Sequence, residues 1–357
     1  MRLLRTVEAN NVAKVRGTTD QRIDALLTLL AENATFVIPG PKIASEIGVT
    51  RSTVWTWVQK LRELGVKVKG HPRTGYHIER IPDILAPKLL AHRLAGTQFG
   101  RRFVHFFKVG STNSVAMRLG EEGEPHGTVV VAEEQTAGRG RAGRKWLSEK
   151  STGIYASALL RPPIAPMQAP LLTLVTGLAA YDAVADELAL IQPGAATSAT
   201  RKARLDIRWP NDLLMHGRKF SGILTEMHAE PGNIHYAVVG IGINVNQSEM
   251  PDEIRSVATS LRIETGRTHS RLELLIRLLR KLDHYYNLFV ARGSEPILVR
   301  FAEVSTYFRG KRVKITNAHE AFTGTTAGLE ASGVLRVERD DGTGTELVVT
   351  GDVGEAK

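Results

Sequence analysis

Residues 138–146 read GRGRAGRKW, and the first six of them satisfy the glycine pattern G-x-G-x-x-G of dinucleotide-binding sites. Such a site requires a helix with an apolar face directly after the glycines, and an acidic residue about 20 positions further on for the ribose. The chain instead runs into a predicted strand, GIYASALL (153–160), and around the expected acid it reads RPPIAP (161–166). Both conditions fail, and the phosphate-loop pattern G-x-x-x-x-G-K-[ST] is also absent.

The same loop concentrates positive charge on a pliable backbone. Its cations are Arg139, Arg141, Arg144 and Lys145, and its glycines are Gly138, Gly140 and Gly143. Guanidinium groups match phosphate and carboxylate oxygens in two-point geometry, and glycines let a backbone fold closely around a ligand. We therefore predict that the loop wraps an anionic small molecule. The alternative is a mobile basic surface loop without a ligand.

Composition narrows the class of protein. At 357 residues the chain is long enough for two or three domains, and its 42% hydrophobic and 24% charged residues are typical of a globular protein. The absence of cysteine excludes a disulfide framework and a thiolate zinc site, and it fits a reducing cytoplasm. We expect neither secretion nor membrane insertion, because the sequence has no signal peptide and no run of roughly 18 apolar residues. The net charge of +10 favours a polyanionic partner such as nucleic acid or a nucleotide.

A winged helix-turn-helix is predicted near the N-terminus. TTDQRIDALLTLLAEN (18–33) repeats apolar residues at the i, i+3, i+4, i+7 spacing of one buried helix face. PKIASEIG (41–48) and VTRSTVWTWVQKLRELG (49–65) predict two further helices, with Thr50 as the N-cap of the second. VKVKGHPRTGYHI (66–78) alternates apolar and polar residues on both sides of a glycine-containing turn, which predicts a two-stranded wing.

Such a module places the second helix of the pair in the DNA major groove, while basic residues beside it meet phosphates. The candidate contacts at the start of this helix are Thr50, Arg51, Ser52, Thr53 and Thr56, and the candidate phosphate contacts are Lys60, Lys67, Lys69 and Arg73. We interpret Trp55 and Trp57 as packing or DNA-backbone contacts rather than sequence readers. The alternative is a protein-interaction module whose lysines are simply solvated.

From about Phe103 onward, short Val/Ile/Phe-rich runs alternate with amphipathic segments, which predicts an α/β or α+β core. GTVVVAEE (127–134) is a predicted buried strand that leads straight into the glycine-arginine loop. DIRWPNDLLMHGRKFSGILTE (206–226) predicts a strand, a tight turn and a hairpin, and IHYAVVGIGINVN (234–246) predicts a further strand. Residues 305–357 alternate apolar and polar residues between glycine turns, which predicts a small β-barrel.

Together with GSTN (110–113) and EEQTAGRGRAGRKW (133–146), the segments at 206–226 and 234–246 resemble the biotin protein ligase family. The resemblance is to its bifunctional bacterial form, in which one chain is both biotin ligase and biotin operon repressor, and it extends from about residue 20 to the C-terminus. Lipoyl ligases share the fold, but their arginine-rich and triple-glycine motif is not visible here. The small-residue stretch at 192–205 looks like a flexible insertion, and we assign it no function.

The resemblance implies an α+β fold in several domains. A tail at 1–19 precedes a winged helix-turn-helix DNA-binding domain at 20–82. A mixed α/β ligase domain like that of class II aminoacyl-tRNA synthetases follows at 83–304, and an SH3-like small β-barrel occupies 305–357. The implied location is the cytoplasm.

The resemblance also implies the residues of the active site. Those implied to bind biotin are Ser111, Thr112, Asn113, Gln135, Arg139, Gly140, Arg141 and Lys219, and those implied to bind the nucleotide are Arg144, Lys145, Trp146, Asn211 and Asn244. Lys219, Arg141 and Asp212 are implied as catalytic residues, with Asp212 as a ligand of Mg²⁺. Two local alternatives stay open, and one residue departs from the family's pattern. Ser111 is a good helix cap, Asn211 and Asp212 are good turn formers, and Arg208 stands where family members commonly carry a lysine.

The implied reaction has two steps. Attack of the biotin carboxylate on the α-phosphate of ATP gives biotinyl-5′-AMP and pyrophosphate, and the biotinyl group then passes to a lysine of a biotin carboxyl carrier protein. Because both reactants of the first step are anions, fixed positive charge lowers its barrier.

In the bifunctional form biotinyl-5′-AMP is also the corepressor: the loaded ligase forms a homodimer and binds a two-fold operator DNA. Three rival hypotheses remain at this stage. They are a biotin-sensing repressor with a degenerate ligase domain, a ligase with a non-functional DNA-binding domain, and a ligase for another acyl acid.

Overall fold

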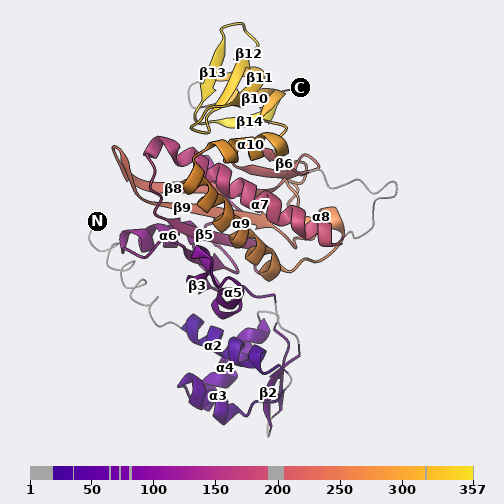
Figure 1. Ribbon diagram of the computed structural model, residues 1–357. Coiled ribbons are helices and arrows are strands. Elements are labelled where there is room, and N and C mark those ends of the chain that lie inside the picture. Colours follow the sequence, from indigo (N-terminus) through magenta and orange to yellow (C-terminus); the bar gives the residue numbers. More distant parts are fainter. Residues whose placement is uncertain are drawn as a thin grey trace, which may run out of the picture.

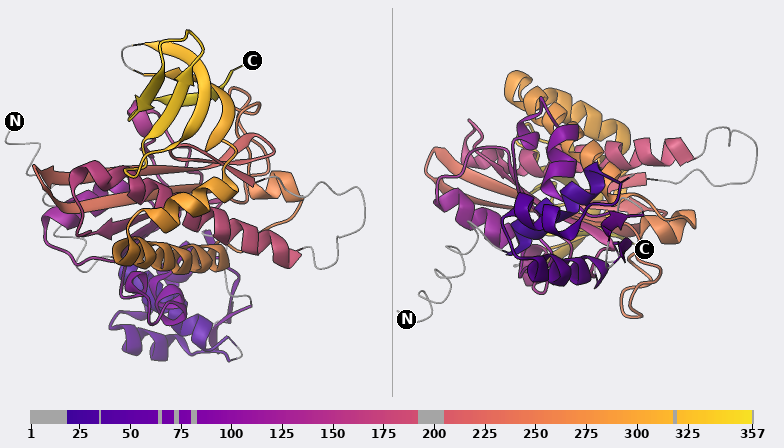
Figure 2. Two further views of the ribbon diagram at one scale, coloured as in Figure 1. Left: turned by 45° about the horizontal axis from the view of Figure 1, so that its top comes forward. Right: turned by 90° about the horizontal axis from the view of Figure 1, so that it is seen from below.

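A computed structural model describes residues 19–34, 36–63, 66–71, 74–79, 83–191, 205–317 and 320–356. The predicted tail before residue 19, the candidate phosphate contact Arg73 and the insertion at 192–204 lie outside these residues. The described chain forms three units in sequence order. A helical unit lies at one end, a sheet covered by helices lies in the middle, and a second sheet lies at the other end (Figures 1 and 2).

The N-terminal unit is a helix-turn-helix with a two-stranded wing. It consists of α2 (Thr19–Glu32), α3 (Gly40–Ile47), α4 (Arg51–Glu63), β1 (Val68–His71) and β2 (Gly75–Ile78). The two strands pair antiparallel, and Gly48 ends α3 in the left-handed conformation that favours glycine. Trp57 packs into the core of this unit, whereas Trp55 is exposed. Of the two predicted roles, packing is therefore confirmed for Trp57, whereas for the exposed Trp55 only a contact with DNA remains, which stays a prediction.

A seven-stranded mixed sheet forms the middle of the molecule. Its strands, in spatial order, are β3 (Arg102–Phe106), β4 (Thr128–Ala132), β5 (Gly153–Leu160), β9 (Asn233–Asn244), β8 (Arg218–Glu230), β7 (Asp212–Met215) and β6 (Leu205–Arg208). Strands β3 and β4 run parallel, and the other neighbours run antiparallel. Along β4, Val130 packs with α6 (Thr112–Glu121) on one face, while Val129 and Val131 belong to the large core on the other.

Long helices cover the second face of this sheet. Helix α7 (Ala169–Ile191) follows a 3-10 turn, η4 (Pro166–Gln168), and packs against β8, α9 (Arg271–Arg292) and α10 (Glu295–Val304). The remaining short helices are α5 (Pro87–Arg93), η2 (Gln98–Gly100), η3 (Arg141–Gly143) and α8 (Leu261–Thr265). Helix α7 is apolar on nearly all sides, which suits its burial between the sheet and α9. Within the ranges described, no helix is long and apolar enough to cross a membrane.

The C-terminal unit is a five-stranded antiparallel sheet. Its strands are β10 (Arg309–Thr316), β11 (Ala321–Leu329), β12 (Leu335–Arg339), β13 (Thr345–Val348) and β14 (Asp352–Glu355), in the spatial order β13-β12-β11-β10-β14. Val313 and Leu335 belong to the same hydrophobic core as the central unit. The buried Trp209 donates its indole N–H to the backbone oxygen of Gly333 at 2.9 Å. The sheet is therefore fixed next to the predicted Trp-Pro-Asn-Asp turn.

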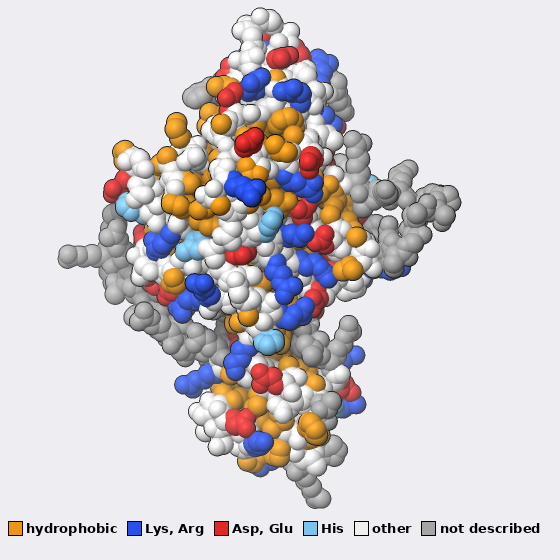
Figure 3. Space-filling view, in the orientation of Figure 1, with side chains coloured by type: hydrophobic (Ala, Val, Ile, Leu, Met, Phe, Trp, Pro, Cys, Tyr) orange, Lys and Arg blue, Asp and Glu red, His pale blue; other side chains and the backbone are white. Residues whose placement is uncertain are grey.

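On the face shown in Figure 3, Lys and Arg side chains are scattered over all three units, with hydrophobic side chains between them at the N-terminal end. The net charge alone therefore does not locate a functional site, which has to be found from the cavities and the side chains that line them.

Candidate functional site

One cavity of about 280 Å³ brings together side chains from separate parts of the central unit. Its lining includes every residue predicted for biotin, nucleotide or catalysis, namely Ser111, Thr112, Asn113, Gln135, Arg139, Gly140, Arg141, Arg144, Lys145, Trp146, Asn211, Asp212, Lys219 and Asn244. Apolar side chains such as Ile223 and Ile241 line it as well. A concave site with an apolar wall and a few converging polar groups is typical of a small-molecule pocket.

Three glycines on adjacent strands form the floor of the cavity. A Cβ on Gly240 would lie 2.0 Å from Asn113 Oδ1, and a Cβ on Gly242 would lie 2.4 Å from Cε2 of Trp146. A Cβ on Gly222 would approach Trp146 and Lys219 to 3.0 Å. Because glycine occupies these positions, the side chains of Asn113 and Trp146 lie directly on the sheet.

A polar network lines one end of the cavity. Gln135 Oε1 accepts hydrogen bonds from the backbone N–H of Thr112 at 2.8 Å and from its hydroxyl at 3.1 Å. The buried hydroxyl of Ser157 contacts Thr112 Oγ1 at 2.8 Å and Asn113 Oδ1 at 2.6 Å. Ser111 stands at the N-cap position of α6 without a capping hydrogen bond from its side chain, and it is buried against the cavity. Its geometry therefore favours a ligand-facing role over the plain helix cap.

The glycine-arginine loop is an ordered hairpin. The backbone N–H of Gly140 donates to the oxygen of Arg144 at 2.7 Å, and that of Trp146 donates to Gly138 at 2.9 Å. At the tip, Ala142 and Gly143 have φ values of 53° and 72°. A Cβ on Gly138 would lie 2.4 Å from the backbone oxygen of Trp146, so this glycine permits the close approach of the two arms.

The three arginines of the hairpin contact three different elements. Arg139 pairs with Glu226 of β8 at 2.7 Å, and Arg141 donates to Asn211 Oδ1 at 3.0 Å. Arg144 forms a two-point pair with Asp352 of β14 at 3.0 and 2.7 Å. Glu226 also accepts from Asn113 Nδ2 at 2.9 Å. The hairpin is thus held over the cavity by the same carboxylate that positions Asn113.

Positive charge gathers around one carboxylate at the other end. Asp212 Oδ1 lies 2.5 Å from Lys219 Nζ, and its Oδ2 lies 2.7 Å from Arg208. Burial disfavours the charged form of Asp212, but Lys219 and Arg208 outweigh it and hold the pKa of this carboxyl below its usual range. Lys219 Nζ also lies 5.5 Å from the centre of the Trp146 ring. The turn interpretation of Asp212 is therefore incomplete, because the side chain orients two cations at the cavity.

The prediction that Asp212 binds Mg²⁺ stays a prediction, since an ion on the phosphates of ATP needs only one or two protein carboxylates. Among the described residues, no group of three His, Cys, Asp or Glu side chains has the arrangement of a metal site. Each oxygen of Asp212 already faces a cation, whereas Mg²⁺ requires near-octahedral oxygen ligands. We assign no step of the reaction to a metal.

Sequence reasoning missed several residues of the site. Ser157 lies in the otherwise apolar strand β5. A hydroxyl in a buried strand needs a polar partner, and this was the one signal in the sequence that Ser157 belongs to a polar network. Glu226 is the last residue of a quoted motif but was given no role. A segment after β9 lines the cavity with Gln247, Glu249, Met250, Pro251, Ile254, Val257 and Ala258. The backbone N–H of Lys219 donates to the oxygen of Val257 in this segment at 2.8 Å. The sequence of the segment has no helical or strand periodicity from which its place at the cavity could have been predicted.

The predicted DNA-contacting residues lie on α4 and the wing. Thr50 caps α4 by accepting from the N–H of Thr53 at 3.2 Å, and its hydroxyl also contacts those of Ser52 and Thr53. A groove between α4 and the wing is lined by Pro39, Gly40, Pro41, Arg51, Ser52, Trp55, Arg62, Gly70, Thr74, Gly75 and Tyr76. Of the candidate phosphate contacts, Lys60 and Lys67 are exposed and Lys69 forms an ion pair with Glu79.

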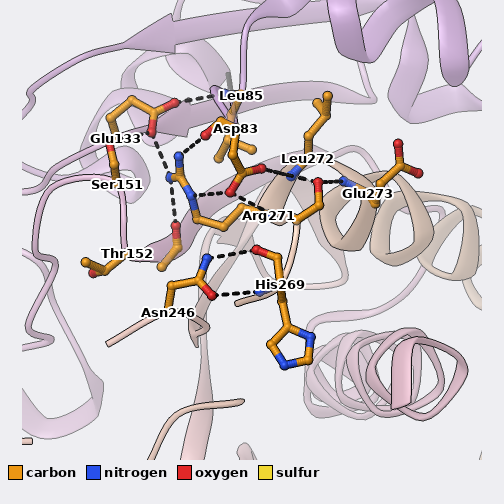
Figure 4. A network of polar contacts seen from close by, with 12 residues as sticks. Asp83, Leu85, Glu133, Ser151, Thr152, Asn246, His269, Arg271, Leu272 and Glu273 are labelled. Atoms are coloured by element: carbon orange, nitrogen blue, oxygen red, sulfur yellow. Dashed lines mark hydrogen bonds and ion pairs between the residues drawn. The ribbon is translucent and has the colours of Figure 1, made fainter. Parts of the chain in front are cut away.

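A buried network connects the N-terminal unit to the start of the glycine-arginine loop, and Figure 4 shows the side of it where Arg271, Asp83 and Glu133 meet. Glu133, at the end of β4, accepts from Arg271 at 2.7 Å and from the backbone N–H of Leu85 at 2.8 Å. His105 lies between Glu133 at 3.4 Å and Asp24 of α2 at 3.1 Å. Although burial disfavours its charged form, these two carboxylates raise the pKa of His105 to about 9. The N-terminal unit and the central unit are therefore joined by buried charged side chains, one of which, Glu133, lies two residues before Gln135.

The winged helix and the cation-lined cavity define a DNA-binding module joined to a ligase that handles anionic small molecules. Residues 107–244 match the biotin/lipoate A/B protein ligase family, and residues 22–77 match an HTH domain. The bifunctional ligase/repressor BirA of Bacillus subtilis is 33% identical over 319 residues, which cover 89% of this chain and 94% of that protein. The chain belongs to this family of bifunctional biotin ligase/repressors.

Two ligases without the repressor description are also similar. The biotin–[acetyl-CoA-carboxylase] ligase of Mycobacterium tuberculosis is 33% identical over 279 residues, which cover 77% of this chain and 97% of that protein. The biotin protein ligase from Aquifex aeolicus, solved in complex with biotin and ATP, is 31% identical with a TM-score of 0.57, and covers 71% of this chain and 98% of that one. The resemblance and the α+β fold class predicted from the sequence are confirmed.

Proposed function

We propose that the chain joins biotin to ATP, forming biotinyl-5′-AMP and pyrophosphate, and then transfers the biotinyl group to a lysine of a biotin carboxyl carrier protein. The observation that carries this proposal is the convergence of all the predicted site residues on one cavity with Lys219, Arg208 and Arg141 at its charged end. The apolar wall suits the aliphatic tail of biotin. The hydroxyl and amide groups of Thr112, Asn113 and Gln135 suit its ureido ring, which both donates and accepts hydrogen bonds.

In the first step, a carboxylate oxygen of biotin bonds to the α-phosphorus of ATP while the bond to the β-phosphate oxygen breaks. Negative charge collects at the α-phosphate in this step. Lys219 and Arg141 line the same cavity and are the cations that we propose to stabilise it. Preorganised cations stabilise such charge without having to reorient during the reaction. Asp212 holds Lys219 and Arg208 in place before the substrates arrive. Arg144, Lys145, Trp146, Asn211 and Asn244 are proposed to contact the nucleotide.

In the second step, the ε-amine of the acceptor lysine attacks the acyl carbon of the mixed anhydride, and the bond to the phosphate oxygen breaks. AMP leaves, and the amine loses a proton. Until the acceptor arrives, water has to be kept from the adenylate. The hairpin at 138–146 lies over the cavity and is held at Glu226, Asn211 and Asp352, so it is placed to do this.

The N-terminal unit supports a second, regulatory activity, namely repression of biotin genes through operator DNA. The predicted contacts Arg51 and Ser52 are exposed at the start of α4, whose N-terminal residues would meet base edges in the major groove of DNA. We place the domain boundaries near residues 82 and 304 and propose that the adenylate-loaded chain works as a homodimer in the cytoplasm. A dimer spans two half-sites and makes more phosphate contacts than a monomer. Association in the presence of biotin and ATP, measured by gel filtration, tests this proposal, and a species unchanged in size would contradict it.

Pyrophosphate release tests the choice of substrate. The full-length protein is mixed with ATP, Mg²⁺ and either biotin or lipoate, and pyrophosphate is measured over time. We expect release with biotin and at least 100-fold less with lipoate, because lipoate has no ureido group to satisfy the buried polar network. Pyrophosphate release with lipoate but not with biotin would show that the cavity serves another acyl acid.

A further inference from the structure

The recognition helix carries a large aromatic side chain that the fold does not use. Trp55 lies in the second turn of α4 and is 57% exposed, whereas Trp57, two residues later, is 6% exposed and belongs to the core. Arg51 and Ser52 precede Trp55 by one turn and line the same groove. An aromatic ring left in water contributes little to stability, and tryptophan is enriched at interfaces with partners.

The groove beside Trp55 has a fixed shape. Arg62, from the last turn of α4, donates from Nε to the backbone oxygen of Val68 at 3.0 Å, which ties the wing to the helix. A Cβ on Gly70 would lie 3.0 Å from the Tyr76 ring, and a Cβ on Gly75 would lie 2.0 Å from the backbone oxygen of Ile38. Glycine at these two positions lets the two strands of the wing, and the segment before α3, lie close together. Trp55 therefore lies beside a wing that is tied to α4 through Arg62.

We propose that Trp55 reads thymine, through contact of its indole ring with the C5-methyl group in the major groove. This inference rests on the proposed DNA binding and goes beyond it by assigning a base preference to one side chain. Residues in the N-terminal half of a recognition helix face base edges, and Trp55 is the fifth of the 13 residues of α4. The thymine methyl is the apolar feature of the major-groove edge. An indole has a single N–H donor and no charge, which suits this methyl group better than a phosphate.

The experiment removes the methyl group from DNA and the indole ring from the protein. The full-length protein, with biotin and ATP, first selects duplexes from a random pool. The tightest duplex is then remade with single thymines replaced by deoxyuridine, which lacks only the methyl, and affinities are measured by fluorescence anisotropy. We expect deoxyuridine at one or two positions to weaken binding by wild type about fourfold, the effect of one buried methyl. The same change should have no effect on Trp55→Ala.

Lys60→Ala is the matched control, because it changes an exposed side chain of the same helix. It should weaken all duplexes alike, with a shallower salt dependence, and keep the deoxyuridine effect. A wild type insensitive to deoxyuridine at every thymine would overturn the proposal while leaving DNA binding intact, and so would a Trp55→Ala protein with undiminished sensitivity. Failure of wild type to enrich any duplex would overturn the DNA-binding function together with this inference.

Discussion

Replacing Gly240 by alanine should damage the biotin end of the cavity through one displaced side chain. The new Cβ would lie 2.0 Å from Asn113 Oδ1, so the amide has to move. Asn113 then loses its contacts with Ser157 at 2.6 Å, with Glu226 at 2.9 Å and with the backbone oxygen of Leu224 at 3.2 Å. Biotin then meets an Asn113 amide that these contacts no longer hold in place, and the loss of one or two hydrogen bonds to the ligand, each worth about 1 kcal/mol, would weaken biotin binding by about 2 kcal/mol. This corresponds to a roughly 30-fold rise in the KM for biotin.

The assay is pyrophosphate release as a function of biotin concentration at saturating ATP. Gly177→Ala is the control, since its Cβ would meet Ile223 at an ordinary 3.6 Å, and its KM should not change. Asn113→Ala removes the atom with which the new methyl collides, so adding Gly240→Ala to it should have little further effect. Full additivity of the two substitutions, or an unchanged KM in a folded Gly240→Ala protein, would refute the reasoning.

Three further predictions concern the hairpin and the buried network. Arg141→Gly should still form the adenylate, because Lys219 remains, but more slowly, and should retain it poorly, so that pyrophosphate release without an acceptor continues past one turnover per chain. A burst that stops at one turnover, as expected for wild type, would count against this prediction. Glu226→Gln should raise the KM for biotin by no more than about fivefold, because its pair with Arg139 is partly exposed; a rise of 100-fold would mean that this carboxylate contacts the substrate. The pKa of His105 is raised to about 9, so its stabilisation, roughly 3 kcal/mol, is complete below about pH 6.5 and is lost as the pH rises towards 9. The difference in unfolding midpoint between wild type and His105→Gln should shrink over this interval, and a constant difference would contradict the assignment.

Local patterns in the sequence predicted the helices, the strands and the motifs, because these features depend mainly on residues that are neighbours in the sequence. The apolar spacing of Ile23, Leu26, Leu27 and Leu30 specifies a buried face of α2 wherever that helix packs. The glycines of GIGINVN and the cations of GRGRAGRKW were also readable as a site, since both motifs carry their chemistry within a few residues.

Contacts between distant segments were beyond this kind of reasoning. Ser157 gains its role only because β5 lies beneath α6, and Glu226 only because β8 brings it to Arg139 and Asn113. Arg144 was expected at the nucleotide, and its pair with Asp352 depends on where the C-terminal sheet packs. By contrast, the burial of Trp57 and the exposure of Trp55 follow from local pattern, because Val54, Trp57, Val58 and Leu61 form an i, i+3, i+4, i+7 stripe on α4 to which Trp55 does not belong.

The formation of biotinyl-5′-AMP by Lys219 is the central claim, and mass spectrometry tests it directly. Wild type and Lys219→Ala are incubated with biotin, ATP and Mg²⁺, freed of unbound ligand, quenched in acid and analysed for the adenylate, with thermal melts to confirm that both are folded. We predict about one biotinyl-5′-AMP per wild-type chain and at least 100-fold less in the variant, because the cation that we propose to face the reacting phosphate is gone. Equal amounts in the two proteins, or none in wild type, would contradict the account.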